Sequence, residues 1–280
     1  MKIRFIICLV FLVSFLNVKA QENFSVNVNL KTEPTDNINF TETNIGMLFN
    51  KKINSKSQIT NTLEYSNLNL NYDLDKYVSF QNIERLQKIQ DKLEFSQEIT
   101  NSTRLNFEVI PTFNFQQNVS FSDFTLLGSF EIFQKLNSKT SLSVGAARTT
   151  IFGNAKFLPT ASLNYKLNDK TDLKIGFPDS RFSYSNNIRN KFIINNSFNG
   201  SFYNLNIQSY EDKNASKAVL SQMTTSFEYE RNVDKNWFLN FKAGYDFDKK
   251  YKLTDDKNNT VHDFNISSGY ILGIGIKYKQ

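Results

Sequence analysis

Twelve charged residues stand in stretches where apolar and polar residues alternate, and their types and spacing could select solutes by charge. Each lies on the polar side of its stretch, opposite a side rich in Leu, Ile, Val, Phe and Tyr. Side chains two residues apart in a β-strand point to the same face. The sequence therefore predicts that these twelve face a lumen: Lys92, Glu94, Glu98, Arg104, Glu108, Glu131, Lys166, Lys174, Glu228, Glu230, Lys242 and Asp246.

A lumen that mixes acids with bases can work in two ways. Rows of opposite charge make a polar path whose charge selects solutes. Alternatively, the charges pair with one another and fill the interior, because an unpaired buried charge is costly. Acids and bases are interleaved here rather than segregated. The sequence therefore favours a closed or narrow interior.

Catalysis finds little support in the sequence. His262 is the only histidine, and it stands beside Asp263 in a predicted loop. A Ser-His-Asp triad would need a serine from another loop, and nothing in the sequence marks one. Asp255 and Asp256 could pair as acids or bind calcium, but their spacing matches no calcium-loop motif. We predict that the chain is not an enzyme and has no catalytic residues, cofactor or metal site.

The elements that hold the charged residues are predicted to be β-strands. Alternation with period two recurs from Phe24 to Tyr278, as in Leu105–Val109, Trp237–Phe247 and the closing run from Phe264 to Gln280, which is predicted to be one strand. Aromatic residues such as Tyr72 end the apolar faces, as an interfacial girdle would. Many of these runs reach the roughly ten residues that cross a bilayer at a tilt, whereas soluble strands centre near five or six. With a mean hydropathy of −0.43, the pattern favours an all-β, transmembrane, antiparallel up-and-down barrel over a β-sandwich.

The number of strands depends on one region of the sequence. The alternating runs number about thirteen, and an even count is needed if both ends of the chain lie on one side. Pro178-Asp179-Ser180 could turn one strand back on the next, or Asn199-Gly200 could form a hairpin turn. Either turn gives fourteen strands, our best count; twelve would result if Pro178 only kinks a strand.

The predicted connections are of two kinds. Short turns near Asn101 and Leu136 alternate with longer loops at Thr32–Asn39 and Lys249–Asp263. Outer-membrane barrels place tight turns on the periplasmic side and longer loops outside. Within residues 73–89, Ile83, Leu86 and Ile89 recur every three residues, which predicts a short amphipathic loop helix.

Residues 1–20 have the features of a cleavable export signal. Lys2 and Arg4 precede an apolar segment that is too short to span a bilayer comfortably, and Val18-Lys19-Ala20 precedes Gln21. We therefore predict a signal peptide at 1–20 and a single barrel domain at 21–280. The only cysteine, Cys8, lies within the signal. The formal net charge of +6 is too small, and too little clustered, to indicate nucleic-acid binding.

Several stretches resemble a known family. They are the signal ending in Ala-Gln, "FLPTASLNYKLNDKTDLKIGFPDSRFSYS", "NGSFYNL" and "GIGIKYK". They are similar to an uncharacterised family, a domain of unknown function, of Gram-negative outer-membrane β-barrels. The similarity spans most of the chain after the signal and is clearest from Phe157 onward. It implies no activity and no site residues. Such barrels generally end on an aromatic residue that the barrel assembly machinery recognises, whereas here Lys279 and Gln280 follow Tyr278.

The sequence thus predicts an outer-membrane protein of a Gram-negative bacterium. The first functional hypothesis is a small channel or transport barrel for polar or amphipathic solutes. The alternative is a structural or interaction barrel with a filled lumen, which docks another envelope protein through its extracellular loops. The predicted partners are outer-membrane lipid, the assembly machinery and such an envelope protein, and nucleic acid is not among them.

Overall fold

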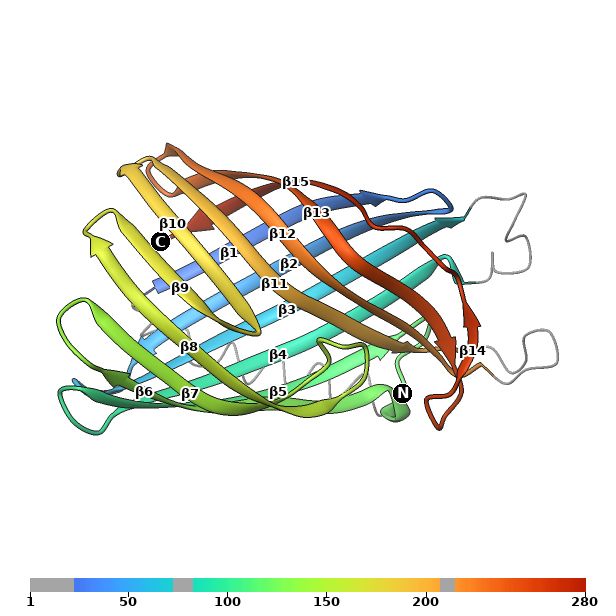
Figure 1. The fold of residues 1–280 in the computed structure, drawn as a ribbon, viewed down its shortest axis with the longest axis horizontal. Coiled ribbons are helices and arrows are strands. Elements are labelled where there is room, and N and C mark those ends of the chain that lie inside the picture. Colours follow the sequence, from blue (N-terminus) through green and yellow to red (C-terminus); the bar gives the residue numbers. More distant parts are fainter. Residues whose placement is uncertain (1–22, 73–82, 207–214) are drawn as a thin grey trace.

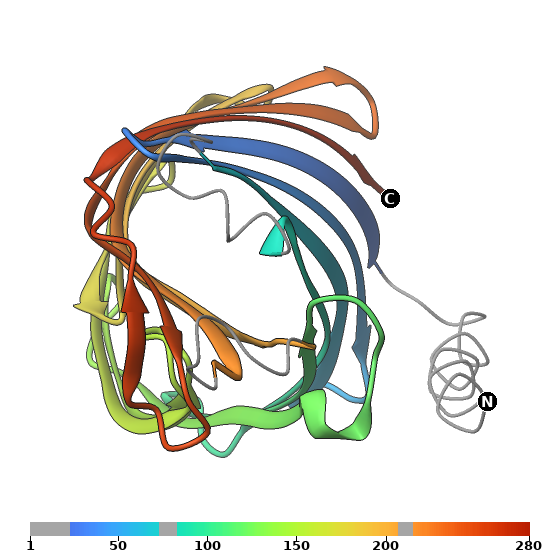
Figure 2. The same ribbon diagram turned by 90° about the vertical axis from the view of Figure 1, so that its right-hand side faces the viewer.

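The computed structural model describes residues 23–72, 83–206 and 215–280. Fourteen of its fifteen strands follow one another around a closed antiparallel barrel (Figures 1 and 2). The ring closes where β15 pairs with β1, from Ser25 opposite Lys279 to Thr32 opposite Leu272. The remaining strand, β14, pairs with the end of β13.

The strands are β1 (Asn23–Pro34), β2 (Ile38–Lys52), β3 (Ser57–Tyr72), β4 (Arg85–Glu98), β5 (Thr103–Phe115), β6 (Phe124–Lys135), β7 (Thr140–Thr149), β8 (Lys156–Asn168), β9 (Thr171–Phe177), β10 (Asp179–Asn187), β11 (Asn190–Asn204), β12 (Lys217–Asp234), β13 (Trp237–Thr254), β14 (Thr260–Asp263) and β15 (Gly269–Lys279). A short 3-10 turn, η3 (Phe121–Asp123), precedes β6. Among the described residues, no helix is long and apolar enough to span a membrane.

The predicted fold class and the count of fourteen strands are confirmed. Pro178 stands between the end of β9 at Phe177 and the start of β10 at Asp179, so it makes the extra turn. The Phe177-Pro178 bond is cis. Asn199 and Gly200 lie inside β11, paired with Gln222 and Ser221 of β12. The longer loop expected at Thr32–Asn39 is instead a tight turn of residues 35–37 between β1 and β2.

The outer face of the barrel carries the apolar side of the alternating pattern. Trp237, Phe241 and Leu272 are 43%, 43% and 57% exposed. In the part of the chain that the structure describes, the barrel wall is a single layer of sheet (Figure 2). Neighbouring strands repeat this arrangement, for example at Phe107, Phe130 and Ile194. Exposed apolar side chains around a closed barrel are what a lipid-facing surface requires.

At the long-loop end, on the right of Figure 1, the apolar side chains of the strands face the interior instead of the outer surface. In β2, Ile45 faces outward, whereas Ile38 and Phe40 are 1% exposed and face the interior. Such inward apolar residues form an apolar cluster beneath the long loops. Its members are Ile38, Phe40, Leu68, Leu70, Tyr72, Ile83, Leu86, Tyr203, Ala215, Ala218, Leu220, Tyr251, Leu253, Phe264 and Ile266.

The inversion has a simple physical reason. Asn67, Asn69 and Asn71 alternate with the cluster residues of β3 and therefore face outward. Polar amide side chains on the outer face require water rather than lipid around them. Strands that continue beyond the lipid need a soluble type of core, with apolar side chains inside and polar side chains outside. In β13 a bulge opposite Ser221 and Met223, with Asp248 at φ 48°, shifts the apolar side chains from the outer face to the interior.

Three sequence predictions fail in this region. The predicted helix at 73–89 falls partly outside the described residues, and from Arg85 onward the chain is strand β4. Its three-residue spacing arose because Leu86 faces the cluster while Ile89 faces outward, on either side of the inversion. Tyr72, expected in an interfacial girdle, lies in the cluster. The closing run was expected to be one strand from Phe264, but β15 begins at Gly269 and Phe264 is buried in the cluster.

The barrel wall is uneven in height. Strands β9 and β10 are short, and their turn at Pro178 lies partway along the barrel (Figure 1). Beyond this turn, β11 leans across the barrel and pairs in parallel with β5 at Asn204 and Phe115. Figure 2 shows the ends of β11 and β12 crossing toward β5. The part that holds the apolar cluster is therefore narrower than the rest of the barrel.

If the apolar cluster acts as a water-excluding core, Leu253→Ala should lower the free energy of unfolding by about 3 kcal/mol, because it leaves a cavity. Leu253 is fully buried, whereas Leu272 is 57% exposed on the outer face. Leu272→Ala makes the same truncation without a cavity, so it should lose only the transfer of the removed carbons from water to detergent, about 2 kcal/mol or less. Urea unfolding in detergent micelles measures both, and equal losses would contradict the assignment.

Candidate functional site

Three cavities follow one another along the lumen and share lining residues. The first, of about 530 Å³, opens at the short-turn end and is lined by residues of β6 to β11. The second, of about 390 Å³, shares Lys174 with the first. The third, of about 480 Å³, shares Ile110, Leu127 and Ile151 with the second and ends against the apolar cluster at Leu68, Tyr203 and Leu220. Each volume is within the range of small-molecule sites.

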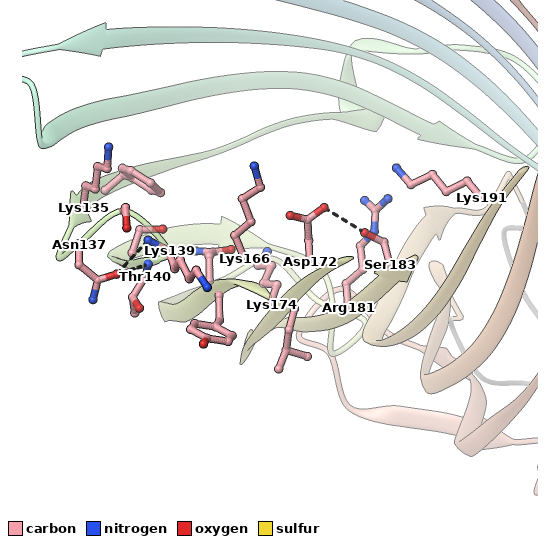
Figure 3. Close-up of a pocket in the computed structure, with 16 residues that line it drawn as sticks. Lys135, Asn137, Lys139, Thr140, Lys166, Asp172, Lys174, Arg181, Ser183 and Lys191 are labelled. Carbon is pink, nitrogen blue, oxygen red and sulfur yellow. Dashed lines mark hydrogen bonds between the residues drawn. The ribbon is translucent and has the colours of Figure 1, made fainter. Parts of the chain in front are cut away.

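The first cavity is a basic mouth. Its lining includes six basic residues and one acidic residue: Lys135, Lys139, Lys166, Lys174, Arg181, Lys191 and Asp172. Figure 3 shows Lys166, Asp172, Arg181 and Lys191 extending from the wall into one common space. Lys166 pairs with Asp169 in the adjoining turn at 2.7 Å, and Lys174 pairs with Asp179 at 2.8 Å. Positive charge remains in excess, which favours anions at this end.

The middle of the lumen holds interleaved acids and bases. Lys92 Nζ lies 2.7 Å from Glu108 and 3.5 Å from Glu94, on β4 and β5. Glu131 lines the same cavity from β6. On the opposite side, Lys242 pairs with Glu228 across β13 and β12 at 3.1 Å.

The remaining predicted residues lie nearer the two ends of the lumen. Glu98 and Arg104 stand opposite each other at the short-turn end of β4 and β5, and the Arg104 guanidinium lies 4.6 Å from the centre of the Phe133 ring. Glu230 pairs with Lys277 at 3.3 Å. Asp246 is fully buried near the apolar cluster, where it accepts a hydrogen bond from Thr224 at 2.6 Å.

Asp246 belongs to a charge network that sequence reasoning did not single out. Lys31 lies 2.6 Å from Glu33 and 2.7 Å from Glu42. Lys249 contacts Glu33, lies 3.4 Å from Asp246, and stacks over the Phe40 ring at 4.2 Å. These five residues of β1, β2 and β13 form a layer directly below the apolar cluster.

The sequence contained a signal for part of this network. Lys31 and Glu33 alternate with Leu30 and Thr32, and Glu42 lies on the polar side of β2. Alternation along β13 could not identify Lys249 as a lumen residue, because the bulge at Asp248 shifts Lys249 to the inner face. Of the residues that line the basic mouth, Lys166 and Lys174 are among the twelve candidates, whereas Arg181 and Lys191 were not singled out.

The loop that holds His262 offers little support for acid catalysis. Asp255 closes its own turn by accepting hydrogen bonds from the Asn259 side chain and backbone at 2.9 and 2.8 Å. These bonds hold the pKa of Asp255 below its ordinary value. His262 lies on β14 with its ring 4.7 Å from that of Phe264. Within the described residues, no group of three or more His, Cys, Asp or Glu side chains could hold a metal ion.

Comparisons with known proteins agree with this architecture. A family model described as "Domain of unknown function (DUF6268)" matches residues 20–279. Comparison with curated protein sequences gives no match.

Two solved structures are similar in fold. An outer-membrane channel from Pseudomonas putida is 9% identical, with a TM-score of 0.50 over 94% of this chain and 97% of that one. A mutant of TodX, a monoaromatic hydrocarbon channel, is 10% identical, with a TM-score of 0.50 over 94% of this chain and 91% of that one; TodX is a P. putida protein. At such identities the likeness concerns the fold alone.

The charge network makes a prediction about stability. Lys249→Met should lower the free energy of unfolding by about 3–5 kcal/mol, because Asp246 would lose its ion-pair partner and Glu33 would keep only Lys31. The neighbouring Lys250 side chain is 51% exposed and pairs with an exposed Asp248. Lys250→Met should therefore cost about 1 kcal/mol or less. Urea unfolding in micelles compares the two variants, and a loss for Lys249→Met no larger than that for Lys250→Met would refute the network's role.

Proposed function

The chain belongs to the family described as a domain of unknown function (DUF6268), an uncharacterised family of outer-membrane barrels, and we propose that it is a channel or transport barrel for polar or amphipathic solutes. The observation that carries this proposal is the series of three cavities along a lumen lined by charged side chains. A filled barrel would leave no such space. The proposal places the barrel in the outer membrane of a Gram-negative bacterium, surrounded by lipid and inserted by the assembly machinery.

The charge of the lining suggests which solutes are preferred. The middle of the lumen balances acids against bases, so it would tolerate either sign of charge. The basic mouth does not balance, and rings of Lys and Arg favour anions in pores. Polar or amphipathic molecules with an anionic group therefore fit the lining best.

A second candidate function is favoured by a different observation. The apolar cluster closes the long-loop end, and the members of the charge network beneath it are paired with one another. A barrel permanently closed in this way would serve as a scaffold, docking an envelope protein through its loops. The two candidates differ in whether solutes cross the protein.

Electrical recording separates these two functions. The purified protein in a planar lipid bilayer should produce stepwise ion currents if it is a channel, because ions can enter through the polar lumen. Protein refolded to the heat-modifiable form on gels provides the folded sample, and heat-unfolded protein provides the control. Silence at high protein load would favour the scaffold and exclude the channel.

Charge reversal at the basic mouth tests the preferred sign of charge. The double variant Arg181→Glu with Lys191→Glu should shift the reversal potential under a salt gradient toward cation selectivity, because it replaces two lumen cations with anions. Lys51→Glu changes the charge at the same end of the barrel but on its outer face, opposite Ile59. It should leave the reversal potential unchanged. An equal shift in both variants would mean that the mouth does not select ions.

A further inference from the structure

The wall of the barrel has a gap between β8 and β11. The strands β9 and β10 end at Pro178, so residues 156–160 of β8 pair with β7 but with no strand on their other side. Phe198 still donates its backbone N–H to Pro178 at 3.2 Å, and beyond it residues 199–203 of β11 pair with β12 alone. The ladder of backbone hydrogen bonds that joins neighbouring strands around the barrel is therefore interrupted between β8 and β11.

The loop of residues 150–155 between β7 and β8 closes this gap. Thr150 donates a side-chain hydrogen bond to the Gly200 carbonyl of β11 at 2.9 Å. The approach is so close that a Cβ on Gly200 would lie 2.5 Å from the Thr150 carbonyl oxygen. Phe152 packs against Phe177 and Phe198, with ring centres 6.3 and 5.6 Å away. The closure is therefore one loop and three rings, where the rest of the wall is hydrogen-bonded sheet.

The two sides of this closure show that it is one layer thick. Phe152 is 42% exposed on the outside, and Phe157, at the start of β8, is 78% exposed. The adjacent residue Ile151 lines both the second and the third lumen cavities. Only this loop separates the outer surface from the cavities at that point.

Apolar side chains continue from the gap into the lumen. Ile110, Leu127 and Leu158 are half-buried and line the cavity behind the loop. Ile110 and Leu127 break the alternation of their strands, because Val109 and Leu126 already occupy the outer face. Elsewhere this cavity is lined by charged groups such as Lys92 and Glu108. An apolar track that leads to charged groups suits a molecule with a hydrocarbon chain and a polar head.

We propose that the gap between β8 and β11 is a lateral port that admits the alkyl chain of an amphipathic molecule from the surrounding membrane into the lumen. The chain lies along Phe152, Ile151, Ile110 and Leu127, and the head group reaches the charged part of the lumen. This inference rests on the proposed transport function and names its substrate class. It also gives the series of cavities an exit that bypasses the apolar cluster.

Fluorescence quenching can detect an alkyl chain in the port. Trp237 is the only tryptophan, so Trp237→Phe provides a background without tryptophan. Into it, Ile151→Trp or Leu158→Trp places a reporter on the lumen side of the closure. The quencher is dodecyl maltoside brominated in its alkyl chain, used as the detergent for the folded, full-length protein. Phe130→Trp, on the lipid-facing surface, is the fully quenched reference, and Phe133→Trp, in the basic mouth, is the lumen reference.

We expect Ile151→Trp and Leu158→Trp to lose most of their emission, as Phe130→Trp does, while Phe133→Trp keeps its emission. Adding Phe152→Ala should increase the quenching at Leu158→Trp, because it thins the closure. The port is refuted if both lumen-side reporters are as protected as Phe133→Trp, or if all three lumen positions are quenched alike. Bilayer currents recorded on the same variants keep the two proposals distinguishable: currents without quenching refute the port alone, and the absence of currents refutes the channel.

Discussion

The structure depends on one constraint, the pairing of every backbone N–H and C=O group in a medium that offers no water. In lipid a sheet meets this requirement only if it closes on itself. Here closure occurs between β1 and β15, the first and last strands, which pair over eight residue positions from Ser25 to Thr32. Once the ring is closed, the outward side chains can be apolar without a covering layer, and the inward side chains are free to be polar.

The interior has two compartments, one lined by charged side chains and the other filled by apolar side chains. Toward the short turns, the lumen is wide and charged, and its pairs, such as Lys92 with Glu108, leave space between them. Toward the long loops, β11 approaches β5, the ring narrows, and the interior becomes an apolar core. The charge network of Lys31, Glu33, Glu42, Asp246 and Lys249 lies at the boundary, where its acids and bases pair with one another.

The sequence was sufficient to predict the fold, but not where the membrane ends. Period-two alternation identifies two faces of a strand, and the exposed positions of Trp237 and Leu272 agree with the predicted lipid side. Alternation does not say which medium each face meets, so Tyr72 and Phe264 were assigned to the wrong environment. The bulge at Asp248 and the inward turn of β11 are set by contacts between distant strands. Neither local pattern nor residue propensity encodes such contacts.

The apolar cluster also bears on how firmly the barrel is held once inserted. Its outward neighbours include Asn69, Asn71 and Lys250, which are polar or charged and stand above the lipid-facing band. Drawing the barrel back through the bilayer would drag these groups through hydrocarbon, at several kcal/mol for each unsatisfied polar group. The packed long-loop end therefore resists withdrawal of the barrel from the bilayer.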